Sequence, residues 1–391
     1  MKLTVIGFGK CGSMIADEFA RLNRRTRIQR GIEIITDAFA VDIDPADLDG
    51  LHTIKPDPQH RVLIESQKTD ADGTARMSEI GAEITMENSN RVIDALRSAR
   101  RFFETDAFLL IAGVGGSTGS GGVPIMAQSV KGCYKDKPVY SLVVLPFKDE
   151  EETEERTIYN AAISLKSIYS VADAVFVADN QRYAAKDPSL RDNLTKMNEL
   201  IVEPFYDLLC AGEEKKTKYI GGSIANAGNI IQTLAGWTAI GCGKLQLPLS
   251  KLPFGRWRTF NQKATETNAG IQAMEAAIGQ LPVECNPADA ESALYLILAP
   301  ARELKIDLFQ ELGSYLKSIA QDAVIRGCDY PRGKDVMSVT VILSGLSSVE
   351  RIGGYYNIVG GFIREIKMRQ AEAESKARAM RTASRKIPSL L

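Results

Sequence analysis

Two glycine-rich segments carry the residues best suited to chemistry. The first, Gly7-Phe-Gly-Lys-Cys-Gly12, follows an apolar run and opens a helical pattern. Backbone N–H groups at such a helix start point outward, and the helix dipole favours a phosphate there. The spacing also fits the dinucleotide-binding GxGxxG, with Asp42 as a possible ribose ligand about 30 residues on, beyond the usual roughly 20. This segment predicts either phosphate binding or a packing turn.

The second segment, Ala112-Gly-Val-Gly-Gly-Ser-Thr-Gly-Ser-Gly-Gly122, follows the apolar run Phe108–Ile111 and precedes another helical pattern. So many glycines beside a strand end cost conformational entropy. They allow backbone amides to close around phosphate oxygens, and Ser117, Thr118 and Ser120 add hydroxyl donors. An NAD(P)-dependent oxidoreductase, the alternative that the first segment leaves open, does not need a second loop of this kind. The pair therefore favours a nucleotide phosphate site.

The elements expected to position these loops alternate between strand and helix up to about residue 185, which predicts a parallel sheet covered on both faces. A long amphipathic helix follows, with apolar residues at helical spacing and Pro204 as an expected kink. The predicted strands are Leu3–Gly7, Phe39–Asp42, Val62–Ile64, Ala107–Ala112, Val139–Leu145 and Ala174–Ala178, and the apolar stripe of the long helix is Leu190, Leu194, Met197, Ile201, Phe205 and Leu208.

The second half of the chain begins with a charged loop at Glu213–Lys218 and a helix near Asn226. Prolines, glycines and basic residues without a period predict a surface loop over 242–262. Strands are expected near Tyr295–Ala299 and Ser338–Leu343, in a second α+β domain. From Arg364 on, eight Lys/Arg face three Asp/Glu, which predicts a basic tail that contacts an acidic surface or is disordered.

Composition narrows the classes of function. The chain has 391 residues, a formal net charge of −1, six cysteines without CxxC spacing and two histidines. These numbers argue against nucleic acid as a partner, a disulfide framework and a histidine-based metal cluster. No apolar run reaches the roughly 18 residues of a membrane span. We expect a cytoplasmic protein without a transmembrane segment.

The second glycine segment is similar to the tubulin/FtsZ signature GGGTG[ST]G, with Ser117 in place of the third glycine. Ile6-Gly-Phe-Gly9, Leu234-Ala-Gly236 and Arg326-Gly-Cys-Asp-Tyr-Pro331 resemble the archaeal CetZ branch of that superfamily. The resemblance implies an α/β fold with a Rossmann-like GTPase domain, a long core helix and a smaller α+β domain. The implied divisions are 1–185 for the GTPase domain, 186–211 for the core helix, 212–240 for an inter-subunit loop and helix, 241–362 for the C-terminal domain and 363–391 for the tail.

The same resemblance implies a site for GTP or GDP with Mg²⁺. Val41-Asp-Ile-Asp-Pro45 resembles the VDLEP loop of tubulin, which puts Asp44 near the metal. Glu152 and Arg156 have the ExxxR spacing used around the ribose, although this acidic run could instead be a solvated loop. Asn180 and Asn198 match the guanine-facing asparagines, and Leu194 stands where the family has a tyrosine. The implied phosphate contacts are Gly9, Lys10, Cys11, Gly12, Ser13, Met14, Gly115, Gly116, Ser117, Thr118, Gly119, Ser120 and Gly121.

The family also implies assembly with itself, head to tail in protofilaments, or with a second family member, in a role such as cell shape. In CetZ proteins a DxxE motif enters the nucleotide site of the next subunit, but this chain has Asn226 and Asn229 at those two positions. An amide cannot accept a proton from water, so we expect slow GTP hydrolysis. The alternative is that Glu213 or Glu214, just upstream, supplies the base.

Overall fold

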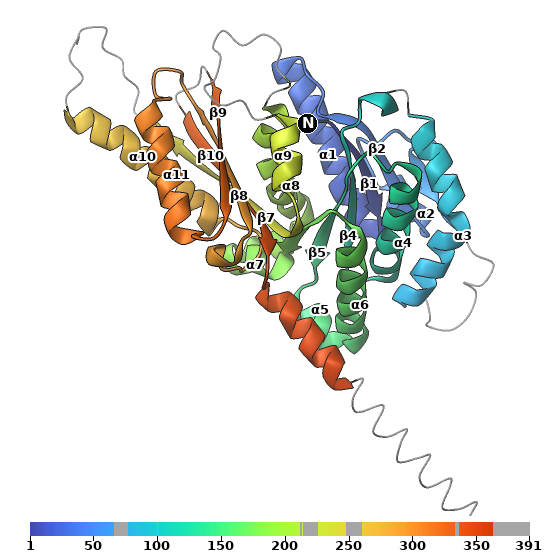
Figure 1. Cartoon of the computed structure of the whole chain (residues 1–391). Helices are drawn as coiled ribbons and strands as arrows, with labels where there is room; N and C mark the ends of the chain where they lie inside the picture. The colour runs from blue at the N-terminus through green and yellow to red at the C-terminus, as the bar shows by residue number, and fades with distance from the viewer. Residues whose placement is uncertain are drawn as a thin grey trace, which may run out of the picture.

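The computed structural model (Figure 1) places most of the chain, and the description below covers only those residues. The predicted basic tail from residue 363 on and most of the charged loop after residue 211 lie outside it. The described residues are 1–65, 77–99, 101–211, 213, 226–247, 260–332 and 336–362, with side chains described in all of these except 260–268.

Ten strands of the described residues form one sheet, in the order β3-β2-β1-β4-β5-β6-β7-β10-β8-β9. From β3 to β7 all neighbours are parallel, so the carboxyl ends of these strands share one edge. The strand β10 runs antiparallel to β7 and β8, while β8 and β9 are parallel. The strands are β1 (Leu3–Phe8), β2 (Ile35–Asp42), β3 (Arg61–Leu63), β4 (Ala107–Gly113), β5 (Val139–Leu145), β6 (Ala174–Asp179), β7 (Gly236–Gln246), β8 (Ser292–Ala299), β9 (Val324–Pro331) and β10 (Val336–Leu346).

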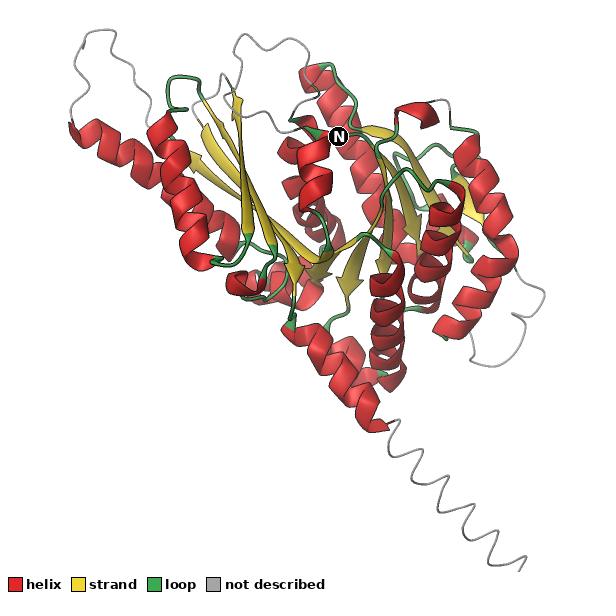
Figure 2. Cartoon of the chain, in the orientation of Figure 1, coloured by secondary structure: helices red, strands yellow, loops and turns green. Residues whose placement is uncertain are grey.

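Helices cover both faces of the sheet (Figure 2), as the alternating pattern predicts. Phe19 of α1 and Phe205 of α8 meet edge to face at 5.3 Å on one face. On the other face, α3, α4 and α6 cover the N-terminal strands, and α10 and α11 cover the C-terminal strands. The helices are α1 (Gly9–Arg30), α2 (Pro45–Asp49), α3 (Ser78–Arg97), α4 (Ser117–Cys133), α5 (Lys148–Thr153), α6 (Glu155–Val171), α7 (Asn180–Lys186), α8 (Leu194–Cys210), α9 (Ala227–Thr233), α10 (Phe260–Gly279) and α11 (Ile306–Ile319), and a further helix covers 350–362.

The long core helix, α8, begins later than the sequence suggests. The segment from 186 on contains the end of α7 and a 3₁₀ helix (Pro188–Arg191), and α8 starts only at Leu194. The Asn193 side chain accepts a hydrogen bond from the backbone N–H of Lys196 and caps the helix there. Pro204 lies inside α8. The apolar stripe is therefore split between two helices.

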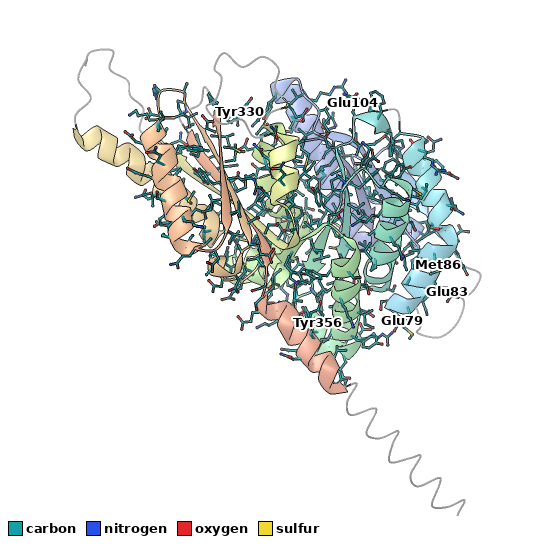
Figure 3. All side chains as sticks on the ribbon, viewed as in Figure 1. Glu79, Glu83, Met86, Glu104, Tyr330 and Tyr356 are labelled. Atoms are coloured by element: carbon teal, nitrogen blue, oxygen red, sulfur yellow. The ribbon has the colours of Figure 1, made fainter. Side chains whose placement is uncertain are left out.

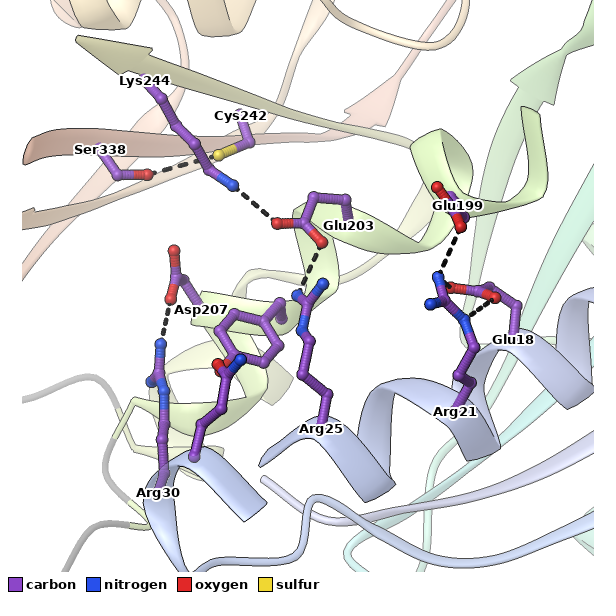
Figure 4. A network of polar contacts seen from close by, with 12 residues as sticks. Glu18, Arg21, Arg25, Arg30, Glu199, Glu203, Asp207, Cys242, Lys244 and Ser338 are labelled. Atoms are coloured by element: carbon purple, nitrogen blue, oxygen red, sulfur yellow. Dashed lines mark hydrogen bonds and ion pairs between the residues drawn. The ribbon is translucent and has the colours of Figure 1, made fainter. Parts of the chain in front are cut away.

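Ion pairs hold α8 between its neighbours (Figure 4). Glu203 accepts hydrogen bonds from Arg25 of α1 and from Lys244 of β7, both at 2.7 Å. At the end of the helix, Arg30 of α1 donates to Asp207 at 2.5 Å, and both side chains are buried. These bridges fix α8 against α1 and against the C-terminal half of the sheet.

The predicted surface loop over 242–262 is wrong at both ends, because β7 runs to Gln246 and α10 begins at Phe260. Gly243, one of the glycines that suggested a loop, and its neighbour Gly241 have a packing role. A Cβ on Gly241 would lie 2.1 Å from the carbonyl oxygen of Ala277, and one on Gly243 would lie 2.0 Å from that of Ala273. Glycine is thus required where α10 lies directly on β7.

Candidate functional site

The turn from β1 into α1 is the first wall of the site. Gly9 has φ +67°, a left-handed conformation that favours glycine. No side chain caps α1, so the backbone N–H groups of its first turn face outward. Gly12 lies behind this turn, since a Cβ there would be 2.2 Å from the carbonyl oxygen of Ile111. Gly12 therefore brings α1 close to β4, and the buried Ser13 donates to the carbonyl of Gly7 at 3.5 Å.

The turn from β4 into α4 forms the second wall. Gly116 precedes α4 without a side-chain cap, and no atom of the described residues lies within 4 Å of the position where its Cβ would stand. The Ser120 hydroxyl donates to the backbone carbonyl of Gly116 and so is turned back onto its own helix. A Cβ on Gly121 would lie 1.9 Å from the carbonyl oxygen of Ser78, so Gly121 serves the packing of α4 on α3.

Both turns open into one cavity of about 830 Å³ at the carboxyl ends of the parallel strands. A cavity of this size accommodates a nucleotide-sized ligand. Of the residues expected to bind nucleotide, Gly12, Ser13, Ser120, Gly121, Glu152 and Arg156 do not line it. Those that line it are Gly9, Lys10, Cys11, Met14, Asp44, Gly115, Gly116, Ser117, Thr118, Gly119, Asn180, Leu194 and Asn198.

The two asparagines approach the cavity from different elements. Asn180 is the first residue of α7, directly after β6, and Asn198 lies one turn into α8 and is buried. An amide both donates and accepts, so the pair can read a base edge that carries both kinds of group. Leu194 is 43% exposed beside them and offers an aliphatic surface to a base.

A carboxylate-rich loop after β2 faces the first glycine turn. Asp42 is only 3% exposed and lines the cavity, and its Oδ2 has no hydrogen-bond partner among the described residues. Burial raises the pKa of Asp42 to about 6. Asp44 caps α2 by accepting from the N–H of Ala46, and Asp47 pairs with the Lys10 ammonium at 3.0 Å. The hydrogen bond from Lys10 to Asp47 raises the pKa of Lys10.

These oxygens fit a hard divalent cation that shares its coordination with phosphate oxygens and water. Within the described ranges, no three His, Cys, Asp or Glu side chains converge closely enough to hold a metal ion by themselves. Mg²⁺ characteristically uses one or two carboxylates together with substrate phosphates. Among the described residues, Asp42 is therefore the one whose carboxylate oxygen best fits this ion.

Glu152 and Arg156, the pair expected at the ribose, lie outside the cavity. Glu152 is exposed on α5. Arg156 forms an ion pair with Glu79 at the start of α3, labelled in Figure 3, and stacks on Tyr159 at 4.5 Å. The acidic run is divided between two helices, because α5 ends at Thr153 and α6 begins at Glu155. Glu150, Thr153 and Glu154 line the cavity instead.

Asn226 and Asn229 are remote from this cavity. Asn226 caps α9, where its Oδ1 accepts from the N–H of Asn229 at 2.8 Å. The Asn229 amide lies 4.0 Å from the Cys328 sulfur of β9. In Figure 1, α9 lies toward the end of the molecule that carries the N-terminus, and α5 and α7 lie toward the other end. The Met1 ammonium donates there to the carbonyl of Leu209, near the end of α8.

Several cavity residues escaped sequence reasoning. Asp47 follows the recognised Val41–Pro45 loop and became visible only through its contact with Lys10. Phe147 and Met197 are apolar residues of an ordinary core pattern and carry no motif. Cys11 was expected in the cavity, and burial raises the pKa of its thiol to about 12, so it stays protonated. Asp42 drew attention only as a possible ribose ligand of a dinucleotide site, and its place beside the first glycine turn comes from the structure.

Comparison with known proteins identifies the family. Residues 2–185 match the GTPase domain of the Tubulin/FtsZ family, and residues 187–358 match the Tubulin-like CetZ C-terminal domain. The tubulin-like protein CetZ1 of Haloferax volcanii is 33% identical over 368 residues, which cover 90% of each chain. This chain belongs to the CetZ group of the tubulin/FtsZ family. The fold class predicted from the sequence is confirmed, and nothing in these matches supports the oxidoreductase alternative.

Solved CetZ structures share the architecture. The GDP-bound monomer of H. volcanii CetZ1 is 30% identical to this chain and superposes with a TM-score of 0.76. The match covers 92% of this chain and 98% of the CetZ1 chain. The GTPγS-bound protofilament of H. volcanii CetZ2 is 25% identical, with coverages of 94% and 100% and a TM-score of 0.77. As for membranes, no helix in the described part of this CetZ-family chain is both long and apolar enough to cross a bilayer.

Proposed function

We propose that this chain binds GTP and GDP, with Mg²⁺ beside the triphosphate, in the cavity at the carboxyl ends of its parallel strands. One observation carries the proposal: both glycine turns, the Asp42 carboxylate and the amides of Asn180 and Asn198 converge on that one cavity. The CetZ1 structure bound to GDP supports guanine as the base.

Each part of the cavity has a task. The uncapped N–H groups at the starts of α1 and α4 hold phosphate oxygens, and the Thr118 hydroxyl adds a donor. Asn180 and Asn198 read the guanine edge while the base rests on Leu194. Asp42 and Asp44 hold Mg²⁺, which neutralises charge on the phosphates when it is bound.

We infer further that subunits assemble head to tail, so that the α9 end of one subunit covers the nucleotide of the next. The separation of Asn226 and Asn229 from the cavity supports this arrangement, as does the protofilament formed by CetZ2. With amides at both positions, water is oriented but not deprotonated, and hydrolysis is slow. None of the six cysteines, all of them described, forms a disulfide, which fits a filament in the reducing cytoplasm, with a role such as cell shape.

The experiment begins with the nucleotide that co-purifies with the full chain. Guanine nucleotide is expected, and a nicotinamide dinucleotide would overturn the proposal. Electron microscopy with a slowly hydrolysed GTP analogue should then show filaments of the pure protein. If filaments form only after a second family member is added, the partner is that protein and not a second copy of this chain.

A further inference from the structure

A single arginine joins the C-terminal helix 350–362 to the nucleotide end of the sheet. Arg351 donates to Asp179 Oδ1 at 2.9 Å and to the backbone carbonyl of Pro146 at 2.9 Å. It also pairs with Glu151 and donates to the Tyr355 hydroxyl at 2.8 Å. Three separate segments, the ends of β5 and β6 and the helix α5, thus meet at one guanidinium.

This cluster is largely buried and has more negative than positive charge. The side chains of Arg351, Asp179 and Glu151 are 14%, 7% and 15% exposed. One cation therefore faces two carboxylates away from water. If the cation is removed, the two carboxylates remain buried near each other without a counter-charge, and the segments that carry them are pushed apart.

The same residues form the outer side of the base subsite. Asp179 caps α7 by accepting from the N–H of Gln181 at 2.9 Å, and α7 begins with Asn180, which lines the cavity. Pro146 also lines the cavity, together with Phe147 just before α5 and Glu150 in the first turn of α5. Arg351 thus holds, from the side away from the cavity, the two segments that flank Asn180: the end of β6 and the segment from Pro146 into α5.

The helix that carries Arg351 is itself firmly packed. Ile352, Tyr355 and Val359 belong to the main apolar core, and Tyr356, on the outer side and labelled in Figure 3, is 38% exposed. The apolar contacts of these side chains do not involve the guanidinium, and the Tyr355 hydroxyl also donates to Glu151 at 2.5 Å. The helix therefore stays anchored when Arg351 alone is changed. The effect of such a change on the cavity can therefore be measured in a folded protein.

We infer that Arg351 is a positioning residue for guanine recognition, and that docking of helix 350–362 and nucleotide binding stabilise each other. This inference rests on the proposed guanine site. Coupling of this kind is reciprocal: the free energy by which the docked helix favours nucleotide binding equals the free energy by which bound nucleotide favours docking of the helix. A contact made at the far surface of this helix is thereby linked to nucleotide affinity.

The test compares three full-length proteins: unmodified, Arg351→Met and Arg30→Met. Arg30 is the matched control, since it is also buried and paired with a carboxylate, Asp207, but at the other end of α8. Dissociation constants for GDP and ADP are measured for each. Arg351→Met should lower the preference for GDP over ADP at least tenfold, whereas Arg30→Met should keep it. An unchanged preference in Arg351→Met would overturn the inference.

A second measurement uses only the unmodified protein and does not depend on how any variant folds. Amide hydrogen exchange over 350–362 should slow when GDP is added, and exchange that GDP leaves unchanged would contradict the coupling. Arg351→Lys keeps the charge but loses the forked geometry of the guanidinium. Its preference for GDP over ADP should therefore lie between those of the unmodified protein and Arg351→Met. Failure of the unmodified protein to prefer GDP would count against the proposed function, whereas a preference that Arg351→Met retains counts only against this inference.

Discussion

The two ends of the subunit differ in what their asparagines do. At the carboxyl edge of the sheet, Asn180 and Asn198 line a cavity beside two glycine turns and a buried carboxylate. At the α9 end, the Asn226 amide caps a helix and Asn229 lies against a cysteine sulfur. The first end carries the groups on which the proposed nucleotide site rests, while the second has amides at the two positions where the family resemblance implies acids. Under the proposed function, recognition and hydrolysis are therefore separable in this chain.

The largest effect is expected when carboxylates are introduced at the α9 end. Asn226→Asp combined with Asn229→Glu should speed GTP turnover by roughly 10²–10⁴ at assembly-competent concentration, because a positioned general base is worth about that much. Nucleotide affinity should stay the same, since the cavity lies elsewhere. Glu213→Gln is the control, because Glu213 is held by the Met1 ammonium at 2.8 Å. A fast unmodified enzyme that the double change does not accelerate would show that other residues do the chemistry.

A smaller effect is expected when the recognition end is damaged. Asn198→Asp exchanges an amide donor for a carboxylate oxygen at a buried position and should weaken GTP binding by about 2 kcal/mol. Calorimetric titration measures the change. Asn193→Asp, at the exposed cap of the same helix, should have no such effect. Equal affinities of the unmodified protein for ATP and GTP would contradict guanine selectivity.

The Asp42 carboxylate makes stability depend on pH. Its pKa is about 6 in the folded protein against an ordinary 3.8, so the folded state favours the protonated form. The resulting stabilisation is complete below about pH 4 and is lost as pH rises through 6. Asp42→Asn should therefore raise the free energy of unfolding of the nucleotide-free protein by roughly 1–3 kcal/mol at pH 8 and leave it unchanged at pH 4.

Denaturant unfolding at the two pH values measures this difference, with the exposed Asp44→Asn as the control. The same Asp42→Asn change should weaken Mg²⁺-dependent nucleotide binding, because it removes the oxygen best placed for the ion. A variant as unstable as the unmodified protein at pH 8 would contradict this account of the buried carboxylate.

The smallest expected effect concerns Lys10, whose charge is largely exposed. Lys10→Met should weaken GTP binding about twofold to fivefold, and added salt should reduce the difference. Asp47→Asn releases Lys10 from its partner and should strengthen GTP binding instead. If both variants bind as the unmodified protein does, Lys10 interacts with Asp47 alone.

The cavity residues that sequence reasoning anticipates are those encoded locally. Both glycine turns, and the asparagines after β6 and in α8, follow short signals in the chain, and all reach the cavity. Asp47 and Phe147 depend on how distant segments pack. Glu152 and Arg156 are displaced because an acidic run does not fix where α5 ends. Gly243 suggested a loop, although its role is to let a helix lie directly on β7.

The central claim is that the α9 end of one subunit completes the nucleotide site of the next. It is tested most directly by GTP turnover per subunit as a function of protein concentration, with sedimentation in parallel. We predict negligible GTP turnover per subunit below a threshold protein concentration, and turnover that increases with the sedimented fraction above it. The increase should be larger for the Asn226→Asp/Asn229→Glu protein. Turnover per subunit that is the same at every concentration, with or without sedimenting polymer, would contradict the account.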